Sequence, residues 1–411
     1  MSAADFPARD GLRYGALGFA LAFVALPLYV HLPAHYATQF GVPLAQLGAL
    51  LLAARGLDAL LDPWLGRLCD RALGRATLGP GLAALGLLLA GGFVALFFPL
   101  PRTPAALLAW AGGALVLTYL AYSALSVLHQ AWGARLGGAP ARQSRIHGWR
   151  EGFALLGVVT ASVLPAAAGF AATSVALALA LLLGLVLLQR APRPSESRSA
   201  ELPLALAWRV GEFRRLLAVF LLNGIAAAVP ATLLLFFIAD RLRLPQHQGL
   251  FLASYFAAAV LSLPLWLHAV ERWGQARCWR AGMALAVAGF SGAVLLGEGQ
   301  LGGFLAVCLA SGAALGADLV VPSAMLAGVI QRAGLAGRAE GAFFGWWNAA
   351  SKLNLALAAG LALPLLQLLG YAPGRQDAAA LQALTLAYCV LPCALKLAAA
   401  ALLHRHFIAT P

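Results

Sequence analysis

Two acidic residues, Asp58 and Asp62, stand four positions apart in the segment AARGLDALLDPWLGRLCDR. That spacing places both carboxylates on one face of a helix. Most neighbouring residues are apolar, and a carboxylate inside a membrane is costly unless it meets a cation or a water-filled cavity. Arg55, one turn earlier, could form a structural salt bridge, but one arginine cannot neutralise two acids. We therefore predict that Asp58 and Asp62 hold a sodium ion or share and release a proton, with Arg55 as a charge partner.

The elements that position these acids are expected to be membrane spans. Of the 411 residues, 62% are hydrophobic and 10% are charged, whereas soluble domains carry about 25% charged residues. An apolar stretch of about 20 residues crosses a bilayer as a helix, because a helix satisfies its own backbone polar groups. The sequence therefore predicts an all-α polytopic membrane protein with twelve transmembrane helices at about 12–32, 42–65, 78–99, 104–131, 148–170, 172–189, 215–239, 247–269, 278–297, 300–331, 339–369 and 378–404.

The net charge of +13 could indicate nucleic-acid binding, but its distribution indicates membrane topology. Most arginines fall in loops on the side of the N-terminus, and positive loops stay in the cytoplasm. We therefore expect cytoplasmic termini, contact with membrane lipid and no nucleic-acid partner. The opposite loops hold only Arg102, Arg241, Arg243 and Arg375.

A weak internal repeat relates the two halves of the chain. Pro27 corresponds to Pro230, and PWLGRLCDR corresponds to PLWLHAVER, at an offset of about 200 residues. Parallel repeats of this kind place a substrate site between the halves, near the bilayer midplane. The predicted division is an N-terminal six-helix bundle at 1–189, a cytoplasmic linker at 190–214 and a C-terminal six-helix bundle at 215–411.

The segment GRLCDRALGR joins the second and third predicted spans. It resembles the G-x-x-x-D-R-x-G-R-R loop motif of the major facilitator superfamily, with one extra residue before the second glycine. Glycine permits close helix approach, an acid suits a helix terminus, and arginines hold the loop inside the cell. An ordinary arginine-rich loop is the alternative. The interpretation we favour is a cytoplasmic gate motif made by Gly66, Asp70, Arg71, Gly74 and Arg75.

The pattern R-x-x-D-A-x-x-D-P followed by G-x-x-x-D-R resembles the glycoside–pentoside–hexuronide:cation symporter family, the melibiose-carrier type. The resemblance extends over nearly the whole chain, including GWREGFALLGV and GAFFGWWNAASKL. It implies two pseudo-symmetric six-helix bundles with the major facilitator fold. In that family the helix-two acids bind the coupling cation, and the first, fourth, fifth and eleventh spans line the substrate cavity. The resemblance thus implies cation binding at Asp58 and Asp62 and cavity roles for Arg150 and Lys352.

This chain departs from the family at positions that matter for specificity. Sugar-binding members carry acids in the first and fourth spans, where this chain aligns Ala22 and Ser123. Leu61 and Leu120 replace side chains that offer sodium a further oxygen or amide ligand. Sodium prefers several oxygen ligands, whereas a proton needs one carboxylate. We therefore expect coupling to a proton in preference to sodium.

Basic residues inside the spans have alternative interpretations. Lys352 lies more than one turn inside its predicted span, and we expect it to pair with Asp58 or Asp62 across the halves. Arg150 precedes Glu151, so a local ion pair is an equal alternative to a cavity role.

Two further charges lie in the C-terminal half. Lys396 is near the end of the last span and is expected to reach the membrane surface. Asp318 in the tenth span is interpreted mainly as a structural acid, with a functional role as the alternative.

Polar and aromatic residues of four spans are candidates for the substrate cavity. Sugar rings stack on aromatic faces, but aromatic residues also serve as packing or interfacial residues, which is the alternative for most of them. Trp346 belongs with this group as a bordering residue. The candidate cavity residues are Tyr29, Tyr119, Tyr122, Ser123, Arg150, Trp347, Asn348 and Lys352.

The sequence carries no motif of an ATP-driven pump or a hydrolase, since G-x-x-x-x-G-K-[ST], H-E-x-x-H and G-x-S-x-G are missing. We expect a secondary transporter for a sugar-like or other small organic solute, not an enzyme. No cofactor or structural metal is expected, and the five cysteines are interpreted as packing residues. The alternatives are an amphiphile transporter such as one for a lysolipid, an exporter, and a non-transporting sensor. Composition favours a bacterial plasma membrane, and we expect a monomer.

Overall fold

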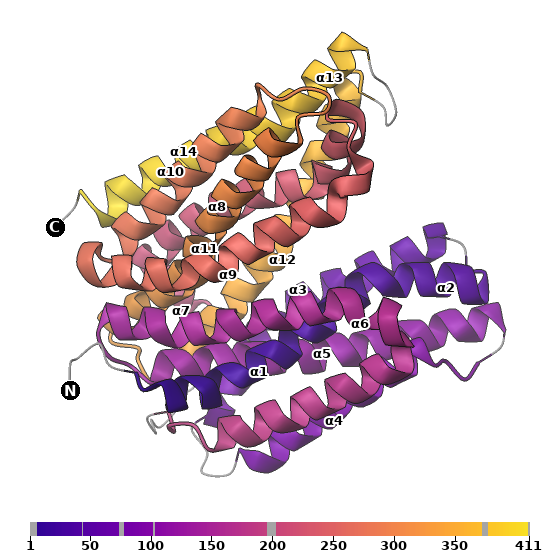
Figure 1. Cartoon of the computed structure of the whole chain (residues 1–411). Helices are drawn as coiled ribbons and strands as arrows, with labels where there is room; N and C mark the ends of the chain where they lie inside the picture. Colours follow the sequence, from indigo (N-terminus) through magenta and orange to yellow (C-terminus); the bar gives the residue numbers. More distant parts are fainter. Residues whose placement is uncertain are drawn as a thin grey trace. The chain divides into compact units, whose positions relative to one another are not determined.

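The computed structural model describes residues 6–42, 44–73, 78–101, 103–194, 203–371 and 377–409. These residues are almost entirely helical and contain no strand (Figure 1). Two compact units form: unit 1 combines the first half of the chain with a segment of the second half, and unit 2 contains the rest of the second half. Unit 1 comprises Met1–Ala207 and Ala327–Ala349, and unit 2 comprises Trp208–Leu326 and Ala350–Pro411. The all-α prediction is confirmed.

Unit 1 contains the spans of the N-terminal half together with the end of α11 (Leu301–Arg332) and the start of α12 (Glu340–Leu368). A π-helical turn at Pro27–His31 follows α1, at a proline that cannot donate a helical hydrogen bond. The helices of this unit are α1 (Ala8–Leu26), α2 (Leu32–Phe40), α3 (Leu44–Leu73), α4 (Gly79–Phe97), α5 (Pro104–Arg135) and α6 (Pro140–Gln189), and the short α7 (Leu206–Arg209) follows.

Unit 2 contains the remaining spans and two further π-helical turns, η2 (Phe237–Arg241) and η4 (Leu386–Val390). Stacked rings fill its core, where the ring centroids of Phe237 and Tyr388 lie 4.2 Å apart. Its helices are α8 (Gly211–Phe236), η3 (Pro245–His247), α9 (Gln248–Trp273), α10 (Gln275–Ala293), α11 (Leu301–Arg332), α12 (Glu340–Leu368), α13 (Ala378–Thr385) and α14 (Leu391–Phe407).

The predicted fifth and sixth spans form one helical run, α6, which bends at Gly169. Its φ of 77° lies in the left-handed region, which glycine adopts without a Cβ clash. The sequence placed the boundary between these spans at 170–172, so the break lies close to the predicted position. Twelve predicted spans therefore correspond to helical segments of the two units.

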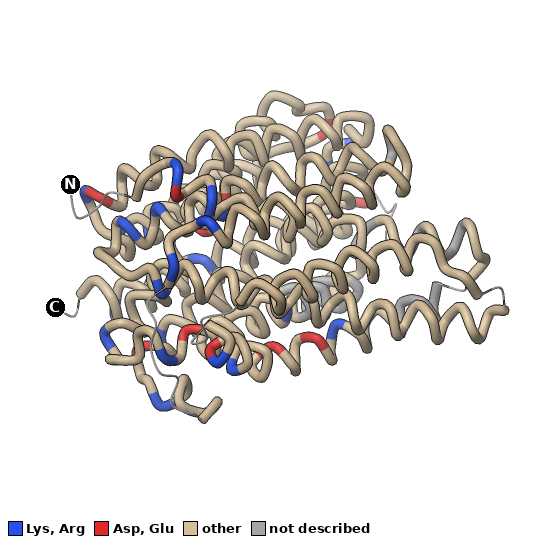
Figure 2. The backbone as a smooth tube through the Cα atoms, turned by 90° about the horizontal axis from the view of Figure 1, so that it is seen from below, with Lys and Arg blue, Asp and Glu red and all other residues tan. Residues whose placement is uncertain are grey.

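The outer faces of the helices suit a lipid solvent. Leu182, Leu261 and Leu295 are among many large apolar side chains that are exposed. In each unit the basic residues lie mostly toward the end that carries that unit's chain terminus (Figure 2). Within the described residues, seven runs are long and apolar enough to cross a membrane: Gly79–Phe97, Pro104–Arg135, Ala167–Gln189, Gly211–Arg241, Pro245–Trp273, Leu301–Arg332 and Ala378–Phe407.

Close packing of α1 against α6 positions the candidate cavity residue Arg150. A Cβ added to Gly18 would lie 2.5 Å from the carbonyl oxygen of Arg150, so only glycine fits there. Tyr14 on α1 donates a hydrogen bond to the carbonyl of His129 on α5, at 2.9 Å. These contacts hold three helices of unit 1 in fixed register around the start of the fifth span.

Candidate functional site

The helix-two acids lie inside unit 1, and one of them has a hydroxyl partner. Asp58 and Asp62 on α3 are 3% and 0% exposed. The hydroxyl of Ser123 on α5 donates a hydrogen bond of 2.6 Å to Oδ1 of Asp58. Ser123 is itself buried. The structure therefore brings together two residues that the sequence assigned separately, Asp58 to cation coupling and Ser123 to the substrate cavity.

Asp62 lies where α3 meets the first part of α12. A Cβ on Gly345 would lie 2.5 Å from the carbonyl oxygen of Asp62, so the two backbones are in direct contact. Pro63 follows within α3 and has no N–H to donate to the carbonyl four residues earlier. The backbone near Asp62 thus has a local interruption in its helical hydrogen bonding. The start of α12 closes over this interruption.

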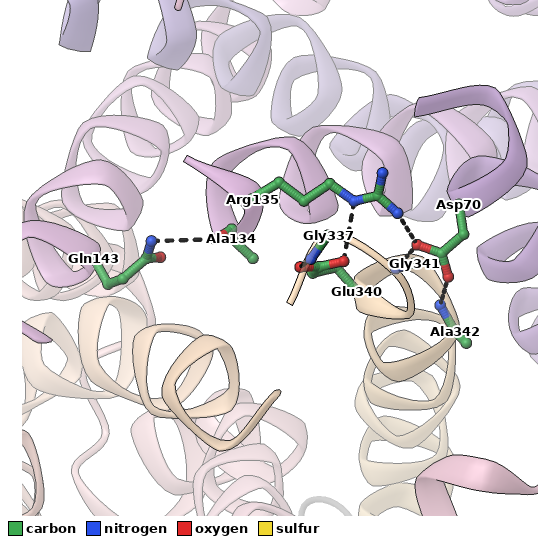
Figure 3. A network of polar contacts seen from close by, with 8 residues as sticks. All are labelled: Asp70, Ala134, Arg135, Gln143, Gly337, Glu340, Gly341 and Ala342. Atoms are coloured by element: carbon green, nitrogen blue, oxygen red, sulfur yellow. Dashed lines mark hydrogen bonds and ion pairs between the residues drawn. The ribbon is translucent and has the colours of Figure 1, made fainter. Parts of the chain in front are cut away.

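A buried network of hydrogen bonds and ion pairs joins the C-terminal end of α3 to the start of α12 (Figure 3). Oδ1 of Asp70 accepts hydrogen bonds from Nη2 of Arg135 and from the N–H of Gly341, each at 2.7 Å. Oδ2 of Asp70 accepts from the N–H of Ala342 at 2.8 Å. Arg135 also donates through Nε to Oε2 of Glu340 at 3.0 Å. One arginine therefore bridges two carboxylates from different helices.

Helix chemistry explains why this network forms. The first N–H groups of a helix have no intrahelical acceptor, and a carboxylate near them is favoured by the helix dipole. Asp70 supplies that carboxylate to α12 from another helix. The close approach depends on small residues, since a Cβ on Gly66 would lie 2.0 Å from the carbonyl oxygen of Gly341.

The predicted gate motif is only partly visible. Gly66 and Asp70 make the contacts described above, while Arg71 is exposed on α3. Gly74 and Arg75 lie outside the described residues. Sequence reasoning missed Arg135, which it counted only as a loop arginine, and it missed Glu340 altogether. The one available signal was an acid at the start of a span, in the segment GLAGRAEGAFF.

The candidate cavity residues differ in their surroundings. Tyr119 and Trp347 are buried, whereas Tyr122 is half-buried. Oδ1 of Asn348 accepts a hydrogen bond of 3.1 Å from Nε2 of Gln130. The side chain of Tyr29 lies outside the described residues. Their role in binding a substrate stays a prediction.

The structure gives an ion pair for one of the two basic residues predicted to line the cavity and does not test the predicted pairing of the other. Arg150 forms an ion pair with its neighbour Glu151, which is the local alternative weighed from the sequence. Lys352 belongs to unit 2 and is half-buried. Its pairing with an acid of α3 stays a prediction.

Unit 2 corrects the expectation for Lys396. This side chain does not reach the membrane surface, because the residue is 3% exposed. Its Nζ donates to Oδ1 of Asn223 at 2.8 Å and to Oδ2 of Asp318 at 3.1 Å. Oδ1 of Asp318 accepts from Nδ2 of Asn223 at 2.9 Å and from Nε1 of Trp279 at 2.8 Å. A buried charge is stable when it is paired and hydrogen-bonded, and four helices supply these partners.

Solved structures with the same fold have related geometry over nearly their full length. A bacterial homologue of the iron transporter ferroportin, in an outward-facing state, has a TM-score of 0.72 at 18% identity and covers 98% of this chain and 99% of its own. The E. coli fucose:proton symporter FucP has a TM-score of 0.66 at 15% identity and covers 96% of this chain and 98% of its own. At these identities the likeness shows the fold alone, which is that of the major facilitator superfamily.

The family is shown by the sequence itself. The model of the MFS/sugar transport protein family matches residues 12–409. The chain therefore belongs to that family, whose members are multi-pass membrane transporters. No curated protein sequence matches the chain significantly. Within the described residues, no group of three or more histidine, cysteine or acidic side chains could hold a metal ion.

Proposed function

We propose that this protein is a cation-coupled symporter that moves a sugar-like or other small organic solute by alternating access, with a proton as the coupling ion. The observation that carries the proposal is the fully buried acid pair on α3, with a serine hydroxyl donating to Asp58 at 2.6 Å. Buried intramembrane acids are costly and mark ion pathways or proton relays. The family match supports transport, and the sequence pattern supports the melibiose-carrier type of coupling.

The preference for a proton follows from the groups around the acids. Leu61 and Leu120 stand where sodium-coupled relatives offer additional ligands. The hydroxyl of Ser123 donates to the carboxylate of Asp58, and in this proposal that acid takes up and releases the proton. Protonation removes the charge from a buried group, which changes the stability of whichever conformation buries it.

The network at Asp70 supports alternating access. In this proposal the start of α12 is held to α3 and α5 when the cytoplasmic side is closed, and it separates when that side opens. A contact of this kind can bias a two-state equilibrium only if it differs between the states. The bond from Asp70 to two backbone N–H groups provides such a difference.

Sugar-driven proton uptake would test the proposal. Proteoliposomes loaded with a pH-sensitive dye would receive melibiose, xylose or glucuronate outside, with and without an inward proton gradient. The wild-type protein should acidify the lumen when a transported sugar is added, and Asp62→Asn should not. Counterflow exchange by Asp62→Asn should persist in part, because the substrate site remains. Uptake that follows a sodium gradient and ignores pH would reject proton coupling.

A further inference from the structure

A cavity of about 160 Å³ lies inside unit 2, between α8, α9, α10, α11 and the run from η4 to α14. An engineered apolar cavity of about 150 Å³ in another protein binds benzene. The space therefore suits one aromatic ring or a branched alkyl group of similar size. Its wall is rich in rings, contributed by Phe251, Tyr255, Phe256, Phe290 and Tyr388.

One end of this cavity is charged. Asp318 and Lys396 both line it, and they form the buried ion pair described above. Apart from this end, the cavity surface is predominantly apolar, as is usual for sites that bind small molecules through a few placed polar groups. The combination of an aromatic pocket and a polar end defines a site for an amphiphile.

Hydrogen-bonding capacity at the polar end is incompletely used. A lysine ammonium has three N–H donors, and two acceptors for Lys396 are found among the described residues. A carboxylate offers about four acceptor positions, and Asp318 receives three donors from Asn223, Trp279 and Lys396. Within the part of the chain that the structure describes, one N–H of Lys396 and one acceptor position of Asp318 are thus left without a protein partner, and both residues line the cavity.

The charge of the pair selects the ligand's head group. Asp318 and Lys396 neutralise one another, so a ligand with a net charge would bring an uncompensated charge into a buried site, which is unfavourable. A hydroxyl is uncharged and can donate to the carboxylate while it accepts from the ammonium. A hydroxyl therefore uses both remaining positions at once.

We propose that unit 2 carries a binding site for a small neutral amphiphile, a ring-sized apolar group that bears one hydroxyl, with the ring in the aromatic cavity and the hydroxyl on the Asp318–Lys396 pair. This site is separate from the coupling acids of unit 1, and the proposal goes beyond transport. Binding can be measured on purified protein without any assumption about coupling or direction. Failure of sugar-driven proton uptake would leave it intact.

The test uses 4-fluorobenzyl alcohol as the probe and ¹⁹F NMR line broadening as the readout, with the protein in lipid nanodiscs. Empty nanodiscs correct for partition of the probe into lipid. We expect saturable broadening that unlabelled benzyl alcohol reverses by competition. The analogue 4-fluorotoluene lacks the hydroxyl and should bind about thirtyfold more weakly, which corresponds to the loss of two hydrogen bonds of about 1 kcal/mol each.

Matched variants on α11 locate the site. Cys308 lines the cavity, and its neighbour Leu309 is exposed on the outer face. Cys308→Phe should abolish saturable binding by filling the space, whereas Leu309→Phe should bind as the wild type does. The competition experiment on unmodified protein decides the matter if Cys308→Phe does not fold. The proposal is overturned by any of three results: broadening no greater than in empty nanodiscs, equal binding of 4-fluorotoluene, or equal loss in both phenylalanine variants.

Discussion

Ser123 on α5 donates a hydrogen bond of 2.6 Å to the carboxylate of Asp58 on α3. Both residues are buried, so the bond is shielded from water. Hydrogen bonds to a charged group contribute about 1.5–3 kcal/mol. This bond ties α5 to α3, the helix that carries the proposed coupling acids. This serine stands at the position where the resemblance to the symporter family predicts an acid in sugar-binding members.

The first prediction concerns that hydroxyl. Ser123→Ala removes the donor, so the buried carboxylate of Asp58 loses this hydrogen bond. Sugar-driven proton uptake should therefore slow by about tenfold, which corresponds to about 1.4 kcal/mol. Ser126→Ala on the same helix is the control and should leave the uptake rate unchanged. An unchanged rate in Ser123→Ala would show that the bond has no part in coupling.

The second prediction concerns Arg135. Arg135→Gln leaves Asp70 and Glu340 buried without their shared cation, and removing one partner of a buried pair costs about 3–5 kcal/mol. The melting temperature should fall, and a cysteine introduced at Ala342 should be alkylated faster. Arg71→Gln is a matched control because Arg71 is exposed next to Asp70. Similar labelling rates in both variants would contradict the idea that the network holds the start of α12 against α3.

The third prediction concerns the close contact of α3 with α12. Gly66→Val would force a side chain into the carbonyl of Gly341, and overpacking typically costs about 1–3 kcal/mol. We expect a lower melting temperature in detergent. Gly56→Val on the same helix has no atom within 4 Å of its Cβ and should unfold as the wild type does. Equal unfolding of the two variants would mean that the helices separate readily at this point.

The fourth prediction concerns Lys352. If this lysine pairs with the acids of α3 in one state, Lys352→Ala should reduce uphill uptake more than it reduces exchange or thermal stability. Lys352→Arg keeps the charge and should retain most of the coupling. A parallel loss of exchange and stability in Lys352→Ala would instead indicate a structural role. Uptake and counterflow measured on the same proteoliposomes separate these outcomes.

The fifth prediction concerns topology. The charge asymmetry predicts that both termini and the loop after α6 are cytoplasmic. An impermeant thiol reagent added outside intact cells should miss a cysteine at Ser197 and label one at Gly374. Both positions lie outside the described residues. The reverse labelling pattern would invert the predicted orientation.

The sequence predicted the fold well because a membrane span is a local property. A stretch of about 20 apolar residues can be recognised in the sequence without knowing what packs against it, and the predicted spans correspond to the observed helices. Contacts between residues that are distant in sequence could not be predicted in this way. Arg135 meets Glu340 across 205 positions, and Lys396 meets Asn223 across 173 positions. A pattern within one segment predicts which residues are buried, but the partner depends on the packing of several helices.

One consequence follows from the placement of three acids on a single helix. Asp58, Asp62 and Asp70 all belong to α3, and 12 residues of helix span about 18 Å. A stiff helix transmits a displacement along its length, so a tilt of α3 near Asp58 and Asp62 would move Asp70 without any relay of side chains. Pro63 lies between Asp62 and Asp70 and removes one backbone hydrogen bond from this helix. In the proposed mechanism, loading one proton would therefore move the Asp70 network, and the bending stiffness of α3 at Pro63 would set how far it moves.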